Sequence, residues 1–195
     1  MRWSNGAAAF GRVIPGGVVL LALFLAVATA SANDFGYPGN YAANNYNHEV
    51  YLSTTLDSDL GSSTDWVTEN TYDPHAEIAG YITLTYRSAN DARVYDGNYG
   101  DTGWYAAAPC LSGATIGGSG QGTWCKPRTI RYNRGAGGQY FDAFDTENER
   151  RHFACHELGH TLGLFHYTDG CMMESGVSYV VGTHNNNHLY FYPFP

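Results

Sequence analysis

The sequence predicts an α+β domain, because several strand patterns and one short helix signal come before a long helix in the last third of the chain. Residues 78–86 and 128–133 alternate apolar and polar side chains, which is the period of a β-strand. Residues 146–166 carry a helix start signal and histidines spaced by one helical turn. Strands gathered ahead of a long helix are typical of α+β folds.

The N-terminal segment, residues 1–32, has the features of a secretory signal peptide. Arg2 and Arg12 provide a basic start, residues 18–27 form a short apolar core, and residues 30–32 (A-S-A) form a small-residue cleavage site. The apolar run is too short for a membrane anchor, although an uncleaved anchor is the alternative. We therefore expect a secreted, extracellular protein that has no membrane association after cleavage.

Charge and length bound the rest of the chain. The 195 residues carry a formal net charge of −8, and cleavage would leave eight basic against 18 acidic residues, a charge of −10. Such acidity argues against nucleic acid as a partner. Residues 33–195 suffice for one domain, which we expect to be a monomer. Residues 33–47 lack periodicity and predict a flexible lead-in, and residues 48–195 predict the folded domain.

The first half of the domain predicts strands around one helix. Residues 48–53, 78–86 and 92–95 are expected strands, and residues 60–72 an expected helix with Ser62 or Ser63 as N-cap.

Residues 96–101 are acidic and glycine-rich. Calcium is possible there but unsupported, because the EF-hand spacing is absent, so we expect a plain turn.

The second half of the sheet comes from three segments. Residues 103–108 predict a strand, residues 112–122 a Ser- and Gly-rich loop, and residues 128–133 the last strand, followed by a turn over 135–138.

A helix then begins at Thr146, which forms a capping box with Glu149.

This helix carries the motif H-E-x-x-H-x-x-G-x-x-H. His156 and His160 lie one turn apart on one face and could hold one ion between their imidazoles. Glu157 is placed to take a proton from a water on that ion. Gly163 favours the left-handed conformation that ends a helix, so that His166 approaches from another direction. Three histidines and an open position are typical of a catalytic zinc site.

Other histidines offer alternatives. His152 lies four residues before His156 and is an alternative ligand, but the longer motif favours His166. His184 and His188 also have ligand spacing in an expected short helix over 184–190. Without an acidic partner beside them, we interpret them as surface residues.

The motif resembles that of the metzincin clan of zinc endopeptidases. Residues 170–175 (G-C-M-M-E-S) resemble the clan's Met-turn, with Met173 as the supporting methionine and Met172 as the alternative. Ser175 stands where some members have a tyrosine ligand, so none is expected. The resemblance implies a twisted mixed sheet of about five strands, a backing helix, the zinc helix and a small C-terminal subdomain.

The resemblance also implies a substrate-binding edge strand. By order along the chain, Trp104, Tyr105 and Ala106 take that place, and the substrate backbone would pair with them. An ordinary half-buried strand is the alternative.

The four cysteines are expected to form two disulfides, because an even count in a secreted chain is typical of disulfide pairing. Three pairings are possible. We prefer the pairs nearest in sequence, Cys110–Cys125 and Cys155–Cys171, the second of which would tie the zinc helix to the Met-turn. A rival hypothesis makes Cys155 and Cys171 metal ligands.

The function expected from the motif and the resemblance is that of a secreted zinc endopeptidase that acts on polypeptides. One Zn²⁺ would be held by His156, His160 and His166, with Glu157 as general base. A zinc hydrolase of non-peptide amides and a catalytically silent binding protein are the alternatives. An altered Glu157 would have been the signature of the silent protein.

Overall fold

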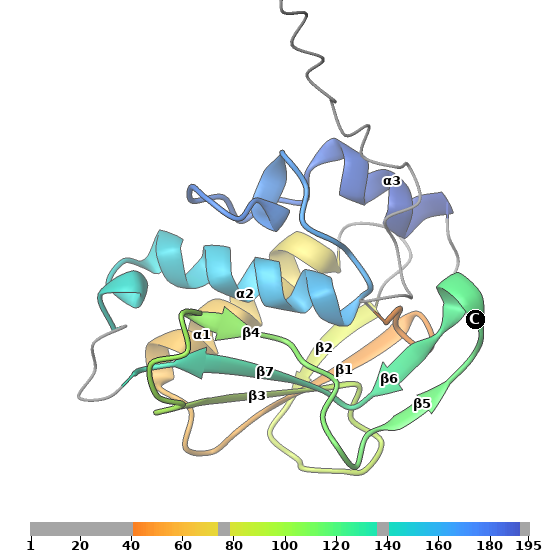
Figure 1. Ribbon diagram of the computed structural model, residues 1–195, viewed down its shortest axis with the longest axis horizontal. Coiled ribbons are helices and arrows are strands. Elements are labelled where there is room, and N and C mark those ends of the chain that lie inside the picture. The colour runs from red at the N-terminus through yellow and green to blue at the C-terminus, as the bar shows by residue number, and fades with distance from the viewer. Residues whose placement is uncertain (1–40, 74–78, 136–140, 192–195) are drawn as a thin grey trace, which may run out of the picture. The chain divides into compact units, whose positions relative to one another are not determined.

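A mixed five-stranded sheet forms one layer of the described chain, with α2 (Glu147–Thr161) and α3 (Thr183–Phe191) above it in the view of Figure 1. The strand order is β2 (Ala79–Thr83), β1 (Asn47–Leu52), β3 (Ala92–Gly97), β7 (Arg128–Asn133) and β4 (Ala106–Ala107). The first four strands run parallel to their neighbours, whereas β4 pairs with β7 in the antiparallel sense. The predicted α+β class is confirmed, and β4 stands at one end of the strand order.

The computed structural model describes residues 41–73, 79–135 and 141–191, which all belong to one unit running from Ala32 to Pro195. The predicted signal peptide and the first part of the lead-in lie outside the described residues. The same is true of Ile78, at the start of a predicted strand, and of most of the predicted turn over 135–138.

The last part of the predicted lead-in is packed into the domain. Ala42 and Ala43 are buried, and the Ala42 amide donates a hydrogen bond of 2.9 Å to the carbonyl of Thr123. Ala42 also forms a parallel bridge with Trp124. The prediction of a flexible lead-in is therefore wrong for these residues, since small alanines and a paired backbone hold them in place.

Helices α1 (Ser58–Val67) and α2 (Glu147–Thr161) pack against each other, and both contribute to the core beside the sheet (Figure 1). The predicted cap of α1 is wrong. Asp57, rather than a serine, caps it, because its carboxylate accepts from the amides of Asp59 and Leu60 at 2.9 and 3.2 Å. A π-helix, Thr68–Tyr72, continues α1.

The core lies between the sheet and the two helices. Val50, Val94 and Ile130, from three adjacent strands, are completely buried and join Leu158 of α2 and Leu162, the residue that caps the end of α2. Full burial of each such side chain stabilises the fold by about 1.5–3 kcal/mol. This core fixes the position of α2 relative to β7 and β4.

A second, two-stranded sheet begins within the predicted Ser- and Gly-rich loop, residues 112–122. Strands β5 (Thr115–Gly117) and β6 (Trp124–Lys126) pair in the antiparallel sense across a short 3₁₀ helix, Gly120–Gly122. The Trp124 ring lies directly against Gly117, where an added Cβ would overlap with it. The prediction of a loop over 112–122 is therefore wrong for residues 115–117, which pair with a strand that lies beyond the predicted loop.

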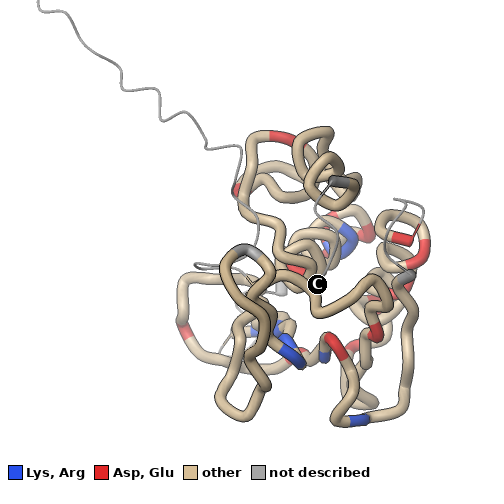
Figure 2. Tube along the Cα trace, turned by 90° about the vertical axis from the view of Figure 1, so that its right-hand side faces the viewer, with Lys and Arg blue, Asp and Glu red and all other residues tan. Residues whose placement is uncertain are grey.

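The predicted turn over 96–101 is wrong for its first two residues. Asp96 and Gly97 belong to β3, where they pair with Tyr132 and Asn133 of β7. The Asp96 carboxylate forms an ion pair with Arg134. Acidic residues occur on several separate segments of the described trace (Figure 2), so the negative charge has no single source.

Shorter elements complete the described chain. They are the 3₁₀ helices Phe141–Phe144 and Gly170–Met172 and the C-terminal helix α3 (Thr183–Phe191). In the three described ranges, no helix combines the length and the apolar character that a membrane crossing requires.

Candidate metal centre

Helix α2 begins at the predicted cap. The Thr146 hydroxyl accepts from the Glu149 amide at 3.2 Å, and the Glu149 carboxylate accepts from the Thr146 amide at 2.8 Å. The capping box is therefore confirmed, and it fixes the start of the helix that carries His156 and His160.

Three histidines converge at the end of this helix. His156 and His160 lie one turn apart, with their Nε2 atoms separated by 3.1 Å, and Nε2 of His166 lies 3.1 Å from that of His160. Gly163 has a φ of 94°, in the left-handed region that favours glycine, and the chain reverses there. The reversal brings His166 to the pair, and the ligand atoms of all three residues lie within 4.8 Å of one another.

The outer nitrogen of each ring is held by a hydrogen-bond acceptor. Nδ1 of His156 donates to the Cys171 carbonyl and Nδ1 of His160 donates to the Leu164 carbonyl, each at 2.8 Å. Nδ1 of His166 lies 2.7 Å from the Glu174 carboxylate. Because an acceptor at Nδ1 fixes the proton there, each Nε2 presents its lone pair to the common point. The cluster therefore fits a metal ion that prefers imidazole.

Burial keeps two of these rings neutral. Desolvation lowers the pKa of His156 to about 4 and that of His160 to about 3. Both imidazoles are then unprotonated near neutral pH, the form in which histidine binds a metal.

Glu157 is buried, at 3% exposure, and lines the same cavity. Its Oε2 has no hydrogen-bond partner among the described residues. Burial raises the pKa of Glu157 to about 8, and the positive charge of Arg128 opposes that rise. A buried carboxylate with an unengaged oxygen beside three histidines is suited to proton transfer.

Arg128 is a buried residue of the cavity that the sequence prediction missed. It is 4% exposed, lines the cavity, and donates from Nε to the Ala108 carbonyl at 2.9 Å. A second guanidinium nitrogen donates to the same carbonyl, and a third reaches the Tyr41 carbonyl at 3.4 Å. The signal was available, because alternation places Arg128 on the same face of β7 as buried Ile130 and Tyr132.

The cavity has a volume of about 490 Å³ and joins the histidines to the predicted edge segment, residues 103–108. The predicted strand is reduced to β4, Ala106–Ala107, while Trp104 and Tyr105 precede it. The Tyr105 carbonyl accepts from the Asn133 amide at 2.7 Å, and the Trp104 carbonyl accepts from the Asn133 side chain at 3.3 Å. A side chain thus replaces part of the strand ladder.

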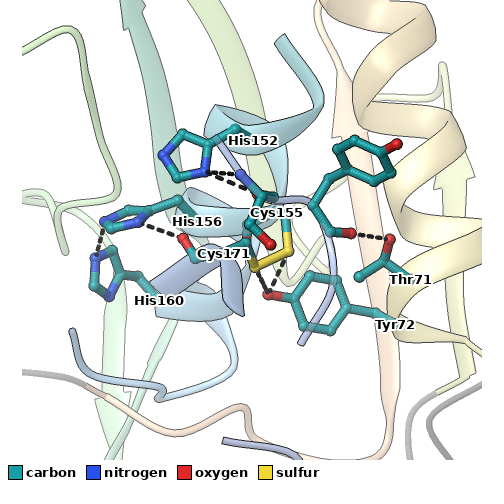
Figure 3. Close-up of a disulfide and its surroundings, with 9 residues drawn as sticks. Thr71, Tyr72, His152, Cys155, His156, His160 and Cys171 are labelled. Atoms are coloured by element: carbon teal, nitrogen blue, oxygen red, sulfur yellow. Dashed lines mark hydrogen bonds between the residues drawn. A yellow bond between two sulfur atoms is a disulfide. The ribbon is translucent and has the colours of Figure 1, made fainter. Parts of the chain in front are cut away.

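A disulfide joins α2 to the segment behind the histidines (Figure 3). Cys155 and Cys171 are bonded, and Tyr72 packs against them, donating to the Cys155 carbonyl at 2.6 Å. The other pair, Cys110–Cys125, is bonded as well, so both predicted disulfides are present and the rival use of Cys155 and Cys171 as metal ligands is wrong. Because the Cys171 carbonyl holds His156, the bond also fixes a ligand ring.

The two methionines beside Cys171 have different surroundings. Met172 is completely buried, and a Cβ added to Gly159 would overlap with its sulfur, so Met172 packs against α2. Met173, predicted as the supporting residue, is half-buried and lines the cavity beside the histidines. Met172 therefore packs against the helix and Met173 lies beside the histidines, and the choice of Met173 for the Met-turn stays a prediction.

His152, the alternative ligand, is engaged elsewhere. Its Nδ1 donates to the Ser178 carbonyl at 2.8 Å, and its ring lies 5.9 Å from that of His156, centroid to centroid (Figure 3). It lines the cavity but is not part of the three-histidine cluster.

A scan of the chain against models of protein families found no match, and a search of curated proteins found none either. The chemistry of the site is therefore inferred from its own residues.

Proposed function

We propose that this chain is a secreted zinc-dependent endopeptidase of the metzincin type. One observation carries the proposal: three Nε2 atoms converge in a cavity that also contains the buried carboxylate of Glu157 and an edge of the sheet. A purely structural metal site has no need of an unengaged carboxylate or of an open side.

The donor set supports zinc. His156, His160 and His166 supply three imidazoles from two directions, and the cavity leaves a fourth side open. A zinc ion held there would act as a Lewis acid that polarises the scissile carbonyl and lowers the pKa of a water toward neutrality.

Glu157 is the proposed general base. Its free Oε2 accepts the proton of the attacking water and then passes that proton to the leaving amine nitrogen. Arg128 favours the ionised carboxylate electrostatically, and burial of Glu157 favours the protonated one. The balance keeps the pKa close to the pH at which both steps must occur.

The substrate is proposed to bind along β4. This strand pairs with β7 on one side and ends the strand order, so a peptide backbone could add to it as a further strand. The side chains of Ala106 and Ala107 are small, which leaves room in the cavity for those of a peptide. Arg128 supports this segment by holding the Ala108 carbonyl.

Secretion is proposed from two features. The two disulfides favour an oxidising compartment, and the first 32 residues have the pattern of a signal peptide.

A second candidate function is hydrolysis of a non-peptide amide. The observation that favours it is the length of β4, which at two residues offers few backbone groups for pairing with an extended peptide.

The test is hydrolysis of casein and of small N-acyl amides by protein purified after secretion of the full chain, with metal content measured in parallel. The matched variant is Glu157→Gln, which keeps the shape of the side chain but cannot accept the proton. We expect casein cleavage by the wild type, and a loss of at least a thousandfold in the variant at equal zinc content. Cleavage of amides alone would favour the second candidate, and a wild type without zinc would overturn both.

A further inference from the structure

Two further histidines, both on α3, have rings that face each other. His184 and His188 lie four residues apart, and their Nε2 atoms are separated by 3.0 Å. The interpretation of both as surface residues is wrong for His188, which is 4% exposed, while His184 is half-buried. Packing of α3 against the domain, not local polarity, decides this burial.

The geometry of this pair matches that of the first two histidines in the three-histidine cluster. The rings of His184 and His188 have centroids 4.6 Å apart and planes at 73°. For His156 and His160 the values are 4.7 Å and 86°, with an Nε2 separation of 3.1 Å. Both pairs therefore direct two nitrogens at a common point from successive turns of a helix.

The 3.0 Å between the Nε2 atoms of His184 and His188 is close to the distance between two ligand nitrogens on one metal ion. Two nitrogens at ordinary Zn–N distances in a tetrahedral site are about 3.3 Å apart. The ring of His184 is held in place by Tyr167, which stacks on it with centroids 3.7 Å apart and planes at 8°. The pair is thus preorganised, because the helix brings the two rings together and stacking on Tyr167 fixes that of His184.

We propose that His184 and His188 form a second binding site for a divalent transition metal ion, weaker than the three-histidine cluster. Imidazole ligands favour Zn²⁺, Cu²⁺ and Ni²⁺ over Mg²⁺ and Ca²⁺. Among the described residues, no third His, Cys, Asp or Glu completes a cluster with this pair, so the remaining positions are open to water or to an external ligand. Two protein ligands in place of three account for the weaker binding.

A bound ion would bridge one turn of α3. Because a ligand that binds only the folded state stabilises it by mass action, zinc in excess of the second dissociation constant should raise the melting temperature further. The site is independent of the proposed peptidase activity and exists whether or not the chain hydrolyses anything.

The experiment is a zinc titration of the full-chain protein after removal of metal by a chelator, followed by calorimetry or by competition with a chromophoric chelator. The wild type should bind two equivalents, one tight and one weaker. His184→Gln, at the half-buried position, should bind one tight equivalent, with affinity for the second reduced at least tenfold. His156→Gln with His160→Gln should remove the tight class and leave the weak one.

The matched control is Asn187→Gln, at an exposed position of the same helix, which should bind two equivalents like the wild type. His188→Gln should repeat the result of His184→Gln, and circular dichroism shows whether this more buried variant folds; if it does not, His184→Gln decides. A wild type that binds a single equivalent, or a His184→Gln variant that keeps the second, would overturn the proposal. In that case the two rings share a hydrogen bond and hold no metal.

Discussion

The carboxylate of Glu174 lies 2.7 Å from Nδ1 of His166, the third histidine of the cluster. The corresponding nitrogens of His156 and His160 donate to backbone carbonyls, which no substitution removes. His166 is therefore the ring of the three whose orientation depends on a side chain. Glu174 is a positioning residue at the exposed side of the site.

Replacement of Glu174 should weaken metal binding. Loss of such an outer partner typically costs 10–100-fold in affinity, and the exposure of this pair places Glu174→Ala near tenfold. Glu174→Gln should lose less, because its amide oxygen still accepts from Nδ1. Competition with a zinc chelator measures both, with Glu69→Gln, an exposed residue far along the chain, as control. Equal affinities for wild type and Glu174→Ala would contradict this role.

Gly159→Ala should destabilise the protein. The added Cβ would overlap with the Met172 sulfur and would lie 2.7 Å from the Tyr72 hydroxyl, and such overpacking costs about 1–3 kcal/mol. The matched control is Gly61→Ala in α1, where the Cβ meets only Leu56 at 3.7 Å. Because alanine has a higher helix propensity than glycine, Gly61→Ala should raise the free energy of unfolding by up to about 1 kcal/mol. Urea denaturation compares the two, and a stabilising Gly159→Ala would refute the packing described.

The two disulfides should contribute similarly to stability but differently to metal binding. They close loops of 15 and 16 residues, so removal of either by a pair of alanine substitutions should cost about 3 kcal/mol. Loss of Cys155–Cys171 should also lower zinc affinity, because the Cys171 carbonyl holds the ring of His156. Loss of Cys110–Cys125 should leave that affinity unchanged. The same affinity in both double variants would argue against coupling between bond and ligand.

Acid sensitivity should arise in part from His48. This histidine is buried, with Nε2 2.9 Å from the Thr161 hydroxyl, and burial lowers its pKa to about 4 despite the opposing charge of Asp91. The unfolded chain binds a proton at this residue below about pH 6.5, whereas the folded chain does not until about pH 4. Stability from neutral His48 is therefore present above pH 6.5 and is lost as the pH falls to 4, by about 3 kcal/mol.

His48→Gln should remove that part of the pH dependence. Chemical denaturation of the metal-free wild type and the metal-free variant between pH 4 and 7 would measure the pH dependence of each free energy of unfolding. The remaining histidines contribute equally to the two proteins. Parallel curves for wild type and variant would show that His48 is not the source.

Local patterns predicted the elements that local physics determines. The strand expected over 128–133 has the bounds of β7, because its alternation matches the burial of every second side chain. Thr146 caps α2 as expected, since the capping box needs only residues three apart. The convergence of His156, His160 and His166 likewise follows from one helix and one glycine turn.

Predictions that depended on distant contacts failed. The wrong cap of α1 is a separate case, because the Asp57 carboxylate that caps this helix contacts amides only two and three residues ahead. Alternation alone places Arg128 on the inward face of its strand, but the carbonyls of Ala108 and Tyr41 that it contacts come from separate segments. No spacing rule contains such contacts.

The three histidines and the disulfide behind them all lie within residues 155–171, whereas the opposite wall of the cavity comes from residues 103–108 and from Arg128. Contacts within a short stretch form early in folding, and those between distant segments form later. The three-histidine cluster could therefore assemble before the opposite wall of the cavity is in place. If the chain is the proposed peptidase, one that acquired a metal ion at that stage would not yet be able to cleave its neighbours.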